Sequence, residues 1–171
     1  MLSRALPLAI SGVIVLADRI TKVAVERSMT AFESIPVLPG WIRLIHTNNP
    51  GAAFGVLAEG NPVLRSIVLI GISALVLMFV ASALWNRNGS FSGTWTRLGL
   101  SLILGGAIGN LYDRVVHGTV TDFIEVYRGT WSFPAFNVAD SAITVGAIFL
   151  LIDLLRPRRK PLHESAELAH K

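Results

Sequence analysis

Long apolar stretches separated by short polar segments dominate the pattern along the 171 residues. The stretch at about 63–85 carries one charged residue, near its start, and Asn61-Pro62 just upstream is typical of a helix start. Two further stretches lie at about 94–117 and 137–155. Each has roughly the 20 apolar residues that a helix needs to cross a bilayer. The pattern therefore predicts three membrane-spanning helices in this part of the chain.

A fourth helix is predicted near the N-terminus, at about 5–26. Residues 5–17 are uncharged, and the charged residues that follow, among them Asp18 and Lys22, continue the helical spacing. A secretory signal peptide is the alternative interpretation of this segment. It fits less well, because no small-residue cleavage pattern follows Ala17.

Two segments between the helices have an extended pattern. Apolar residues at 41–45, after Pro39-Gly40, predict a small β element that lies on the membrane surface. Residues 120–124 predict a short extended segment after the third helix. We expect a single domain over residues 1–155, followed by a polar, basic tail at 156–171.

Composition supports a membrane protein. Apolar residues make up 52% of the chain and charged residues only 15%, against about 25% in an ordinary soluble domain. This balance disfavours a soluble domain, a disordered chain and a coiled coil, and it favours an all-α membrane protein with four transmembrane helices. The absence of cysteine excludes disulfides, thiolate nucleophiles and cysteine-ligated zinc.

The net charge of +4 could indicate a nucleic-acid partner. In a chain this apolar, anionic lipid headgroups are the better explanation, and no nucleic acid is expected. Basic residues are more numerous on the side that holds the N-terminus, the loop at 86–97 and the tail, which contains Arg156, Arg158, Arg159 and Lys160. By the positive-inside rule, both termini are expected in the cytoplasm.

Acidic residues are concentrated toward the opposite, outer side. They comprise Glu33, Glu59, Asp113, Asp122, Glu125 and Asp140, with Asp18 and Glu26 in the outward half of the first helix. Ionisable groups are costly in a bilayer and tend to face a protein interior or a wet cavity, so a functional site is expected at the outer face. Asp153 lies toward the cytoplasm, where it is expected to pair with Arg156.

Two acids lie next to adjacent predicted helices on the outer side. Asp122 lies in the extended segment, and Asp140 lies in the first turn of the fourth helix, after the good N-cap residue Asn137. Each has a simpler explanation: Asp122 could be a solvated loop carboxylate, and Asp140 is favoured there by the helix dipole. Together they suggest a pair that shares a proton, as peptide hydrolysis without serine, cysteine or metal requires.

The third helix carries further polar residues toward this outer side. Gly105 and Gly109 have the spacing that allows close helix packing. Asn110, Asp113 and Arg114 follow at helical spacing. We expect Asn110 to form a hydrogen bond to a neighbouring helix, and Asp113 and Arg114 to belong to a structural polar network.

The remaining candidates are two short motifs. Asp18 and Lys22 are four residues apart and can neutralise each other. Asn49-Pro50-Gly51 forms a compact turn where an Asn and a close backbone approach could hold an extended peptide. The four histidines lack ligand spacing, so neither a metal nor another cofactor is expected.

In combination, these motifs resemble those of the bacterial lipoprotein signal peptidases, also called signal peptidase II. The matching blocks, in chain order, are Asp18 with Lys22, residues 49–54, residues 105–110 with Asp113-Arg114, residues 120–123 and residues 136–141. Each block alone is modest, but five in this order on a four-helix scaffold are highly specific. The resemblance extends to about residue 155, and the tail has no counterpart in the family pattern.

The resemblance implies an aspartyl endopeptidase of the bacterial inner membrane, with its active site at the periplasmic face. Its substrate would be a diacylglyceryl-modified prolipoprotein, cleaved just before the lipidated cysteine, and its other partner membrane lipid. The implied roles are catalysis for Asp122 and Asp140; positioning of substrate or dyad for Asn49, Gly51, Asn110, Arg114 and Asn137; and structural support for Asp18, Lys22 and Asp113. It also implies a periplasmic β element and a surface helix in the first outer loop. We expect a monomer.

Two other classes of protein remain as alternatives. A proton-coupled carrier could use Asp18, Asp113, Asp122 and Asp140 as an ion path. Against it, the acids gather at one face and leave the cytoplasmic half of the second and third helices without ionisable groups of this kind. A structural or chaperone subunit of a membrane complex could use the glycine-rich third helix as an oligomer face.

Overall fold

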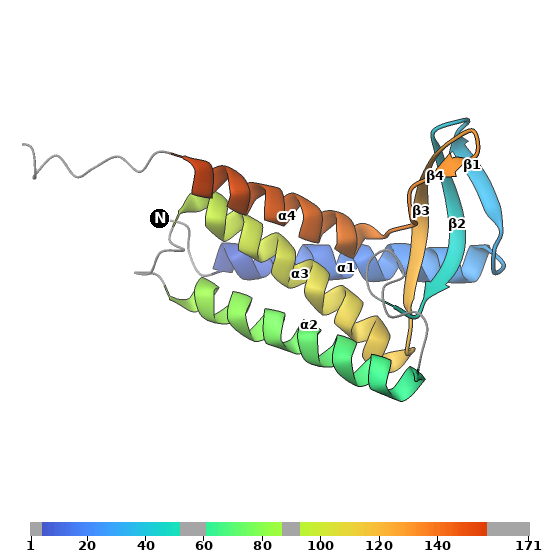
Figure 1. Ribbon diagram of the computed structural model, residues 1–171. Helices are drawn as coiled ribbons and strands as arrows, with labels where there is room; N and C mark the ends of the chain where they lie inside the picture. Colours follow the sequence, from blue (N-terminus) through green and yellow to red (C-terminus); the bar gives the residue numbers. More distant parts are fainter. Residues whose placement is uncertain (1–4, 52–60, 87–92, 157–171) are drawn as a thin grey trace, which may run out of the picture.

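The computed structural model describes residues 5–51, 61–86 and 93–156 and shows four helices with a sheet at one end (Figure 1). The helices are α1 (Ala5–Ser28), α2 (Pro62–Trp85), α3 (Thr94–Val116) and α4 (Val138–Leu155). The strands are β1 (Ser34–Leu38), β2 (Ile42–Asn49), β3 (Val120–Arg128) and β4 (Trp131–Ser132). The sheet lies where α1 and α3 end and where α2 and α4 begin.

The helix predictions are confirmed to within two residues at each end. Asn61 caps α2 by accepting hydrogen bonds from the main-chain N–H groups of Val63 and Leu64, and Pro62 occupies the first turn. Gly118, with φ of +76°, follows the end of α3 in the left-handed conformation that glycine adopts readily. Local capping chemistry therefore sets these boundaries.

The sheet is larger than the sequence predicts. The expected β element (β2) and the expected extended segment (β3) pair antiparallel, and β1 and β4 complete a four-stranded sheet in the order β1-β2-β3-β4. Asn49 pairs with Val120 at one end of the β2–β3 ladder, and Ile42 pairs with Val126 toward the other. This pairing brings β2, in the connection between α1 and α2, against the strand that contains Asp122.

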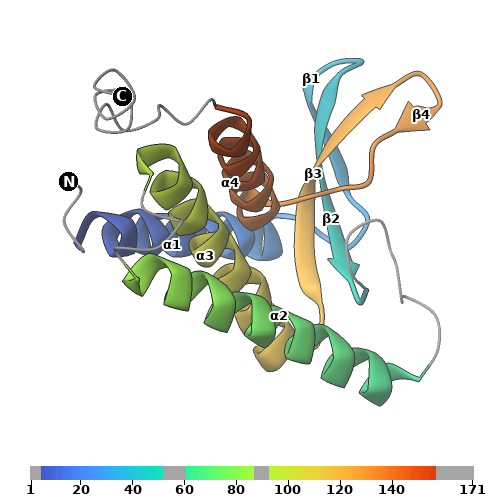
Figure 2. The same ribbon diagram turned by 60° about the vertical axis from the view of Figure 1, so that its left-hand side comes forward.

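Helix α3 is the central element of the bundle, because it packs against α1, α2 and α4 (Figure 2). Close packing against α4 and α1 follows from glycines on two sides of α3. A Cβ atom at Gly105 would lie 2.8 Å from the Ser11 carbonyl oxygen of α1. A Cβ at Gly106 would collide with the Ala139 carbonyl oxygen of α4. A Cβ at Gly109, the other glycine of the spacing noted in the sequence, would lie 2.6 Å from the Asp18 carboxylate of α1, so Gly105 and Gly109 both allow α1 to approach closely.

Two apolar clusters stabilise the fold. One lies between α2 and α3, away from the sheet, and consists of Val80, Ala83, Leu84, Leu100 and Leu104. The other joins the C-terminal part of α1 to the sheet and consists of Val25, Met29 and Phe123. The second cluster fixes the position of β3 over the end of the helix bundle.

The outer surface of the bundle is strongly apolar. On α2, the side chains of Val63, Leu64, Ile67 and Leu75 are each more than 60% exposed. Helices α2 and α4 are long and apolar enough to cross a membrane, by length and composition. Helices α1 and α3 carry more charge and do not meet the same criterion.

The described part of the connection between α1 and α2, residues 29–51, contains strands and no helix. Residues 52–60 lie outside the described residues, so the surface helix stays a prediction. The expected pairing of Asp153 with Arg156 is wrong. Asp153 accepts a hydrogen bond from the Thr96 hydroxyl at the start of α3, and the Arg156 guanidinium lies over the Trp95 ring, 5.0 Å from its centre. The main-chain N–H groups in the first turn of α3 carry partial positive charge, which favours the Asp153 carboxylate at this position.

Candidate active site

Asp122 and Asp140 lie on different elements that meet where the sheet contacts the helix bundle. Asp122 is buried on β3, and Asp140 is the third residue of α4. Asn137 is the N-cap of α4: its side-chain oxygen accepts from the Asp140 main-chain N–H at 2.9 Å. The Asp140 carboxylate accepts in return from the Asn137 main-chain N–H at 3.3 Å. This capping box fixes the direction of the Asp140 side chain.

Asn137 also connects the two carboxylates. Its side chain is fully buried, and its Nδ2 donates to Asp122 Oδ1 at 2.7 Å. Longer contacts from the same nitrogen reach Asn110 Oδ1, at 3.3 Å, and the Thr121 carbonyl oxygen, at 3.4 Å. Since the main-chain N–H of Asn137 binds Asp140 and its amide binds Asp122, one residue sets the positions of both acids.

The other oxygen of each carboxylate is held by a second asparagine. Asn49 Nδ2, from the end of β2, donates to Asp122 Oδ2 at 3.1 Å. Asn110 Nδ2, from α3, donates to Asp140 Oδ1 at 2.7 Å. Each of the four carboxylate oxygens therefore accepts one hydrogen bond from a neutral donor, which orients the pair without adding a neutralising charge. The prediction that Asn110 bonds across to a neighbouring helix is confirmed.

Burial and the nearby Asp140 raise the pKa of Asp122 to about 6, from an ordinary value of 3.8. The hydrogen bonds from Asn49 and Asn137 act in the opposite direction, because they favour the charged form. The larger effect is burial. Asp122 can therefore take up and release a proton near neutral pH, as a carboxylate that exchanges protons during a reaction must.

Arg114 holds the turn that carries Asn49. Its guanidinium donates to the main-chain carbonyl oxygen of Asn110 at 3.3 Å and to that of Gly51 at 3.2 Å. The Gly51 N–H in turn donates to Asn49 Oδ1 at 2.9 Å. The positive charge of Arg114 also acts on Asp122 and Asp140 without forming an ion pair with either. Arg114 thus connects the end of α3 to the turn after β2.

Behind the two acids lies a buried charged cluster on α1 and α3. Lys22 is fully buried, and its Nζ lies 2.8 Å from Asp18 Oδ2, 2.7 Å from Asp113 Oδ2 and 3.2 Å from Asn110 Oδ1. Asp18 Oδ1 accepts from the Ala139 main-chain N–H at 2.9 Å, in the first turn of α4. The predicted pairing of Asp18 with Lys22 is confirmed. Through Asp18, the cluster also supports the helix start that carries Asp140.

All ten candidate residues named from the sequence come together here, and three more side chains join the same network. The sequence analysis does not single out Arg19 or Thr121, and it gives Glu26 only as one of the acids of the first helix. Arg19 lies 3.2 Å from Asp113 and 3.6 Å from Glu26, and Glu26 accepts from the Thr121 hydroxyl at 2.9 Å. Arg19 and Glu26 are seven residues apart on α1, so helical spacing could have paired them. No local pattern could have connected Glu26 with Thr121, since 95 residues separate them.

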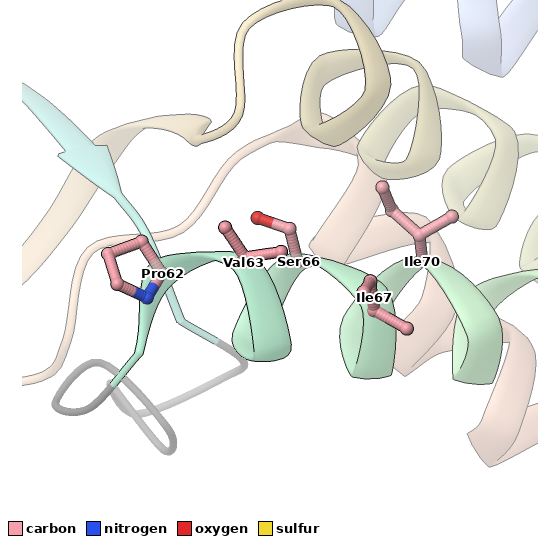
Figure 3. Close-up of a pocket in the computed structure, with 5 residues that line it drawn as sticks. All are labelled: Pro62, Val63, Ser66, Ile67 and Ile70. Atoms are coloured by element: carbon pink, nitrogen blue, oxygen red, sulfur yellow. The ribbon is translucent and has the colours of Figure 1, made fainter.

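Among the described residues, no group of three or more His, Asp or Glu side chains is arranged to hold a metal ion. A shallow groove of about 490 Å³ lies on α2, lined by Pro62, Val63, Ser66, Ile67 and Ile70 (Figure 3). Its lining is largely apolar and includes none of the candidate residues. This groove therefore adds no candidate residue to the site at Asp122 and Asp140.

Comparison with known proteins gives a consistent result. The family described as "Signal peptidase (SPase) II" matches residues 10–156. Proteins named "Lipoprotein signal peptidase" are similar over most of the chain. The one from Solibacter usitatus is 40% identical over 156 residues, which cover 91% of this chain and 94% of the relative. The one from Cupriavidus taiwanensis is 42% identical over 153 residues, which cover 90% and 84%.

Two solved structures have the same fold. Both are described as bacterial membrane enzymes determined by the in meso method. One, at 2.3 Å resolution, is 28% identical with a TM-score of 0.78 and covers 92% of this chain and 94% of its own. The other, at 1.9 Å, is 30% identical with a TM-score of 0.77 and covers 89% and 94%. With the family match across residues 10–156, these likenesses place the chain in one group: it belongs to the signal peptidase II family of aspartic peptidases.

Proposed function

We propose that this peptidase removes the signal peptide of diacylglyceryl-modified prolipoproteins, and that Asp122 and Asp140 are its catalytic dyad. The names of its relatives support prolipoproteins as the substrate class. The observation that carries the assignment of the dyad is the hydrogen-bonded bridge through Asn137, which holds the buried carboxylate of Asp122 and the half-buried carboxylate of Asp140 at one end of the helix bundle. Family membership favours the peptidase over a carrier or a structural subunit.

The proposed reaction uses one proton shared between the two acids. The ionised carboxylate takes a proton from a water molecule whose oxygen attacks the scissile carbonyl carbon, while the protonated partner donates its proton to the carbonyl oxygen. In the tetrahedral diol that results, one hydroxyl returns its proton to a carboxylate. The other acid protonates the departing nitrogen as the C–N bond breaks. Both carboxylates then regain their initial protonation.

The neighbouring residues would keep this geometry ready for the substrate. Asn49, Asn110 and Asn137 orient the carboxylates through the four hydrogen bonds described above. Arg114 holds Gly51, whose small size allows a peptide backbone to lie close to the acids. Such preorganisation matters because the entropy of orientation is lost before the chemical step and not during it.

For the membrane, we propose that all four helices span the bilayer, with both termini in the cytoplasm and the dyad at the periplasmic face. The apolar outer surfaces of α2 and α4 support this arrangement. The charged residues of α1 and α3 are compatible with it, since Lys22, Asp18 and Asp113 are buried inside the bundle and are paired. Cleavage just before the lipidated cysteine would leave the acyl chains in the bilayer while water reaches the dyad.

The test compares three Asp→Asn variants of the purified protein on a lipidated prolipoprotein. Asp122→Asn and Asp140→Asn should each lower turnover by at least about 10²-fold, because an amide cannot exchange the shared proton. The matched control Asp153→Asn changes an acid at the far end of the bundle and should retain turnover. Unimpaired cleavage by both dyad variants would refute the assignment. A reporter fused after the last residue should be active only in the cytoplasm, and periplasmic activity would reverse the proposed orientation.

A further inference from the structure

A polar contact between α1 and β3 lies next to the proposed dyad and has no part in the reaction as written above. The Thr121 hydroxyl donates to Glu26 Oε1 at 2.9 Å, and Thr121 itself is only 5% exposed. Thr121 directly precedes Asp122 on β3. The contact therefore ties the main chain of the proposed catalytic strand to the last turns of α1.

Arg19 holds Glu26 in place for this contact. Its guanidinium lies 3.6 Å from Glu26 Oε2 on one side and 3.2 Å from Asp113 Oδ1 on the other. Since Asp113 is paired with the buried Lys22, Glu26 is connected through Arg19 to the same cluster that supports the start of α4. The cluster is thus linked to the element of each proposed catalytic acid.

Thr121 is fixed at two points. Its hydroxyl binds Glu26, and its carbonyl oxygen lies 3.4 Å from Asn137 Nδ2, the nitrogen that also holds Asp122. Phe123, the residue after Asp122, also packs against Val25 of α1 and Met29 just beyond it. Apolar packing is non-directional, whereas a hydrogen bond to a carboxylate has a defined direction and length.

We propose that Glu26 and Thr121, with Arg19 orienting Glu26, are positioning residues that set the place of Asp122 relative to Asp140. This inference rests on the proposed dyad. The three side chains bind no substrate and act only through β3. Their loss should displace Asp122 by a fraction of an ångström, which slows the chemical step and leaves substrate binding nearly unchanged, because small displacements of reacting groups are costly.

The experiment measures kcat and KM of full-length variants on a lipidated prolipoprotein. Thr121→Val and Glu26→Leu each remove the hydrogen bond and should lower kcat about tenfold, with KM within about twofold. Thr121→Ser keeps the hydroxyl, and Glu26→Gln keeps an oxygen acceptor. Both should retain at least about half of the original kcat. The double variant Glu26→Leu/Thr121→Val should be no slower than either single variant, because both changes remove one contact.

The matched control is Glu33→Leu, which removes a Thr–Glu contact of the same kind on the connection before β1, where Glu33 accepts from the Thr30 hydroxyl at 3.0 Å. Its kcat should be unchanged. An unchanged kcat in Thr121→Val, or a Thr121→Ser variant as slow as Thr121→Val, would overturn the inference. If Glu26→Leu does not fold, the comparison of Thr121→Val with Thr121→Ser decides alone. Failure of the dyad itself would appear separately, as retained turnover in Asp122→Asn.

Discussion

Replacement of Asn137 should lower both the stability of the fold and the rate of cleavage. In Asn137→Ala, α4 loses its cap, which costs about 1 kcal/mol. Asp122 also loses a donor at 2.7 Å, and a hydrogen bond to a charged group contributes about 1.5–3 kcal/mol. The site is fully buried, so water does not readily replace the missing donor. The expected loss is therefore about 3 kcal/mol in the free energy of unfolding.

The assay is unfolding in mixed detergent micelles, with Asn61→Ala as the matched control. Asn61 caps α2 by accepting from the N–H groups of Val63 and Leu64, and it lies at an exposed position. Its replacement should cost about 1 kcal/mol, the contribution of a cap alone. The difference between the two variants, about 2 kcal/mol, measures what the amide of Asn137 contributes by holding Asp122.

A third variant separates the two roles of the residue. Asn137→Ser preserves a capping oxygen but lacks the amide nitrogen that reaches Asp122, so it should recover the cap and not the remaining loss. Turnover should fall by about 10²-fold in both Asn137 variants, because both lose the bridge between the acids, and should stay near normal in Asn61→Ala. Equal stability costs for Asn137→Ala and Asn61→Ala would refute the reasoning, as would normal turnover in Asn137→Ser.

Two further predictions concern pH and close packing. The pKa of Asp122 is raised by burial to about 6, so its contribution to stability is fully present below about pH 4 and is lost as the pH rises through 6, a loss of about 3 kcal/mol. Asp122→Asn should remove this decline. The measurement is the free energy of unfolding of the original protein and of Asp122→Asn from pH 4 to 7.5, and parallel pH curves for the two proteins would contradict the prediction. Gly106→Ala should slow turnover and destabilise the fold, because its Cβ meets the Ala139 carbonyl oxygen beside Asp140. Gly71→Ala, with no atom within 4 Å of the added Cβ, should be neutral or stabilising by up to about 1 kcal/mol, and equal effects of the two changes would count against this packing argument.

The helices could be predicted from the sequence because local chemistry determines where they begin and end. Apolar stretches set their length, and Asn61, Asn137 and Gly118 mark boundaries through capping or a left-handed turn. The sheet could be predicted only in part. Pairing of β2 with β3 joins residues about 75 positions apart, and no local pattern specifies the partner or the register of such strands.

The same distinction explains which site residues were found. Asp18 and Lys22 are paired by helical spacing, and the third-helix polar residues share one helix face. Asp153 was assigned the wrong partner because sequence proximity to Arg156 suggested an ion pair, whereas the open first turn of α3 offers Thr96 across the bundle. The contact of Glu26 with Thr121 was missed for a related reason, since only the folded chain brings α1 to β3.

The formal charges of the side chains around the proposed dyad sum to zero, which is compatible with one proton shared between the two acids. Three basic and three acidic side chains surround it: Arg19, Lys22 and Arg114, and Asp18, Glu26 and Asp113. Because their formal charges cancel, they do not supply the net positive charge that would keep two adjacent carboxylates ionised. Burial of Asp122 and the neighbouring charge of Asp140 then favour the protonated form of Asp122. A carrier would need its acids to change charge along a path, whereas the proposed dyad would hold one proton between two acids at one end of the bundle, which is the condition that acid–base hydrolysis of a peptide bond requires.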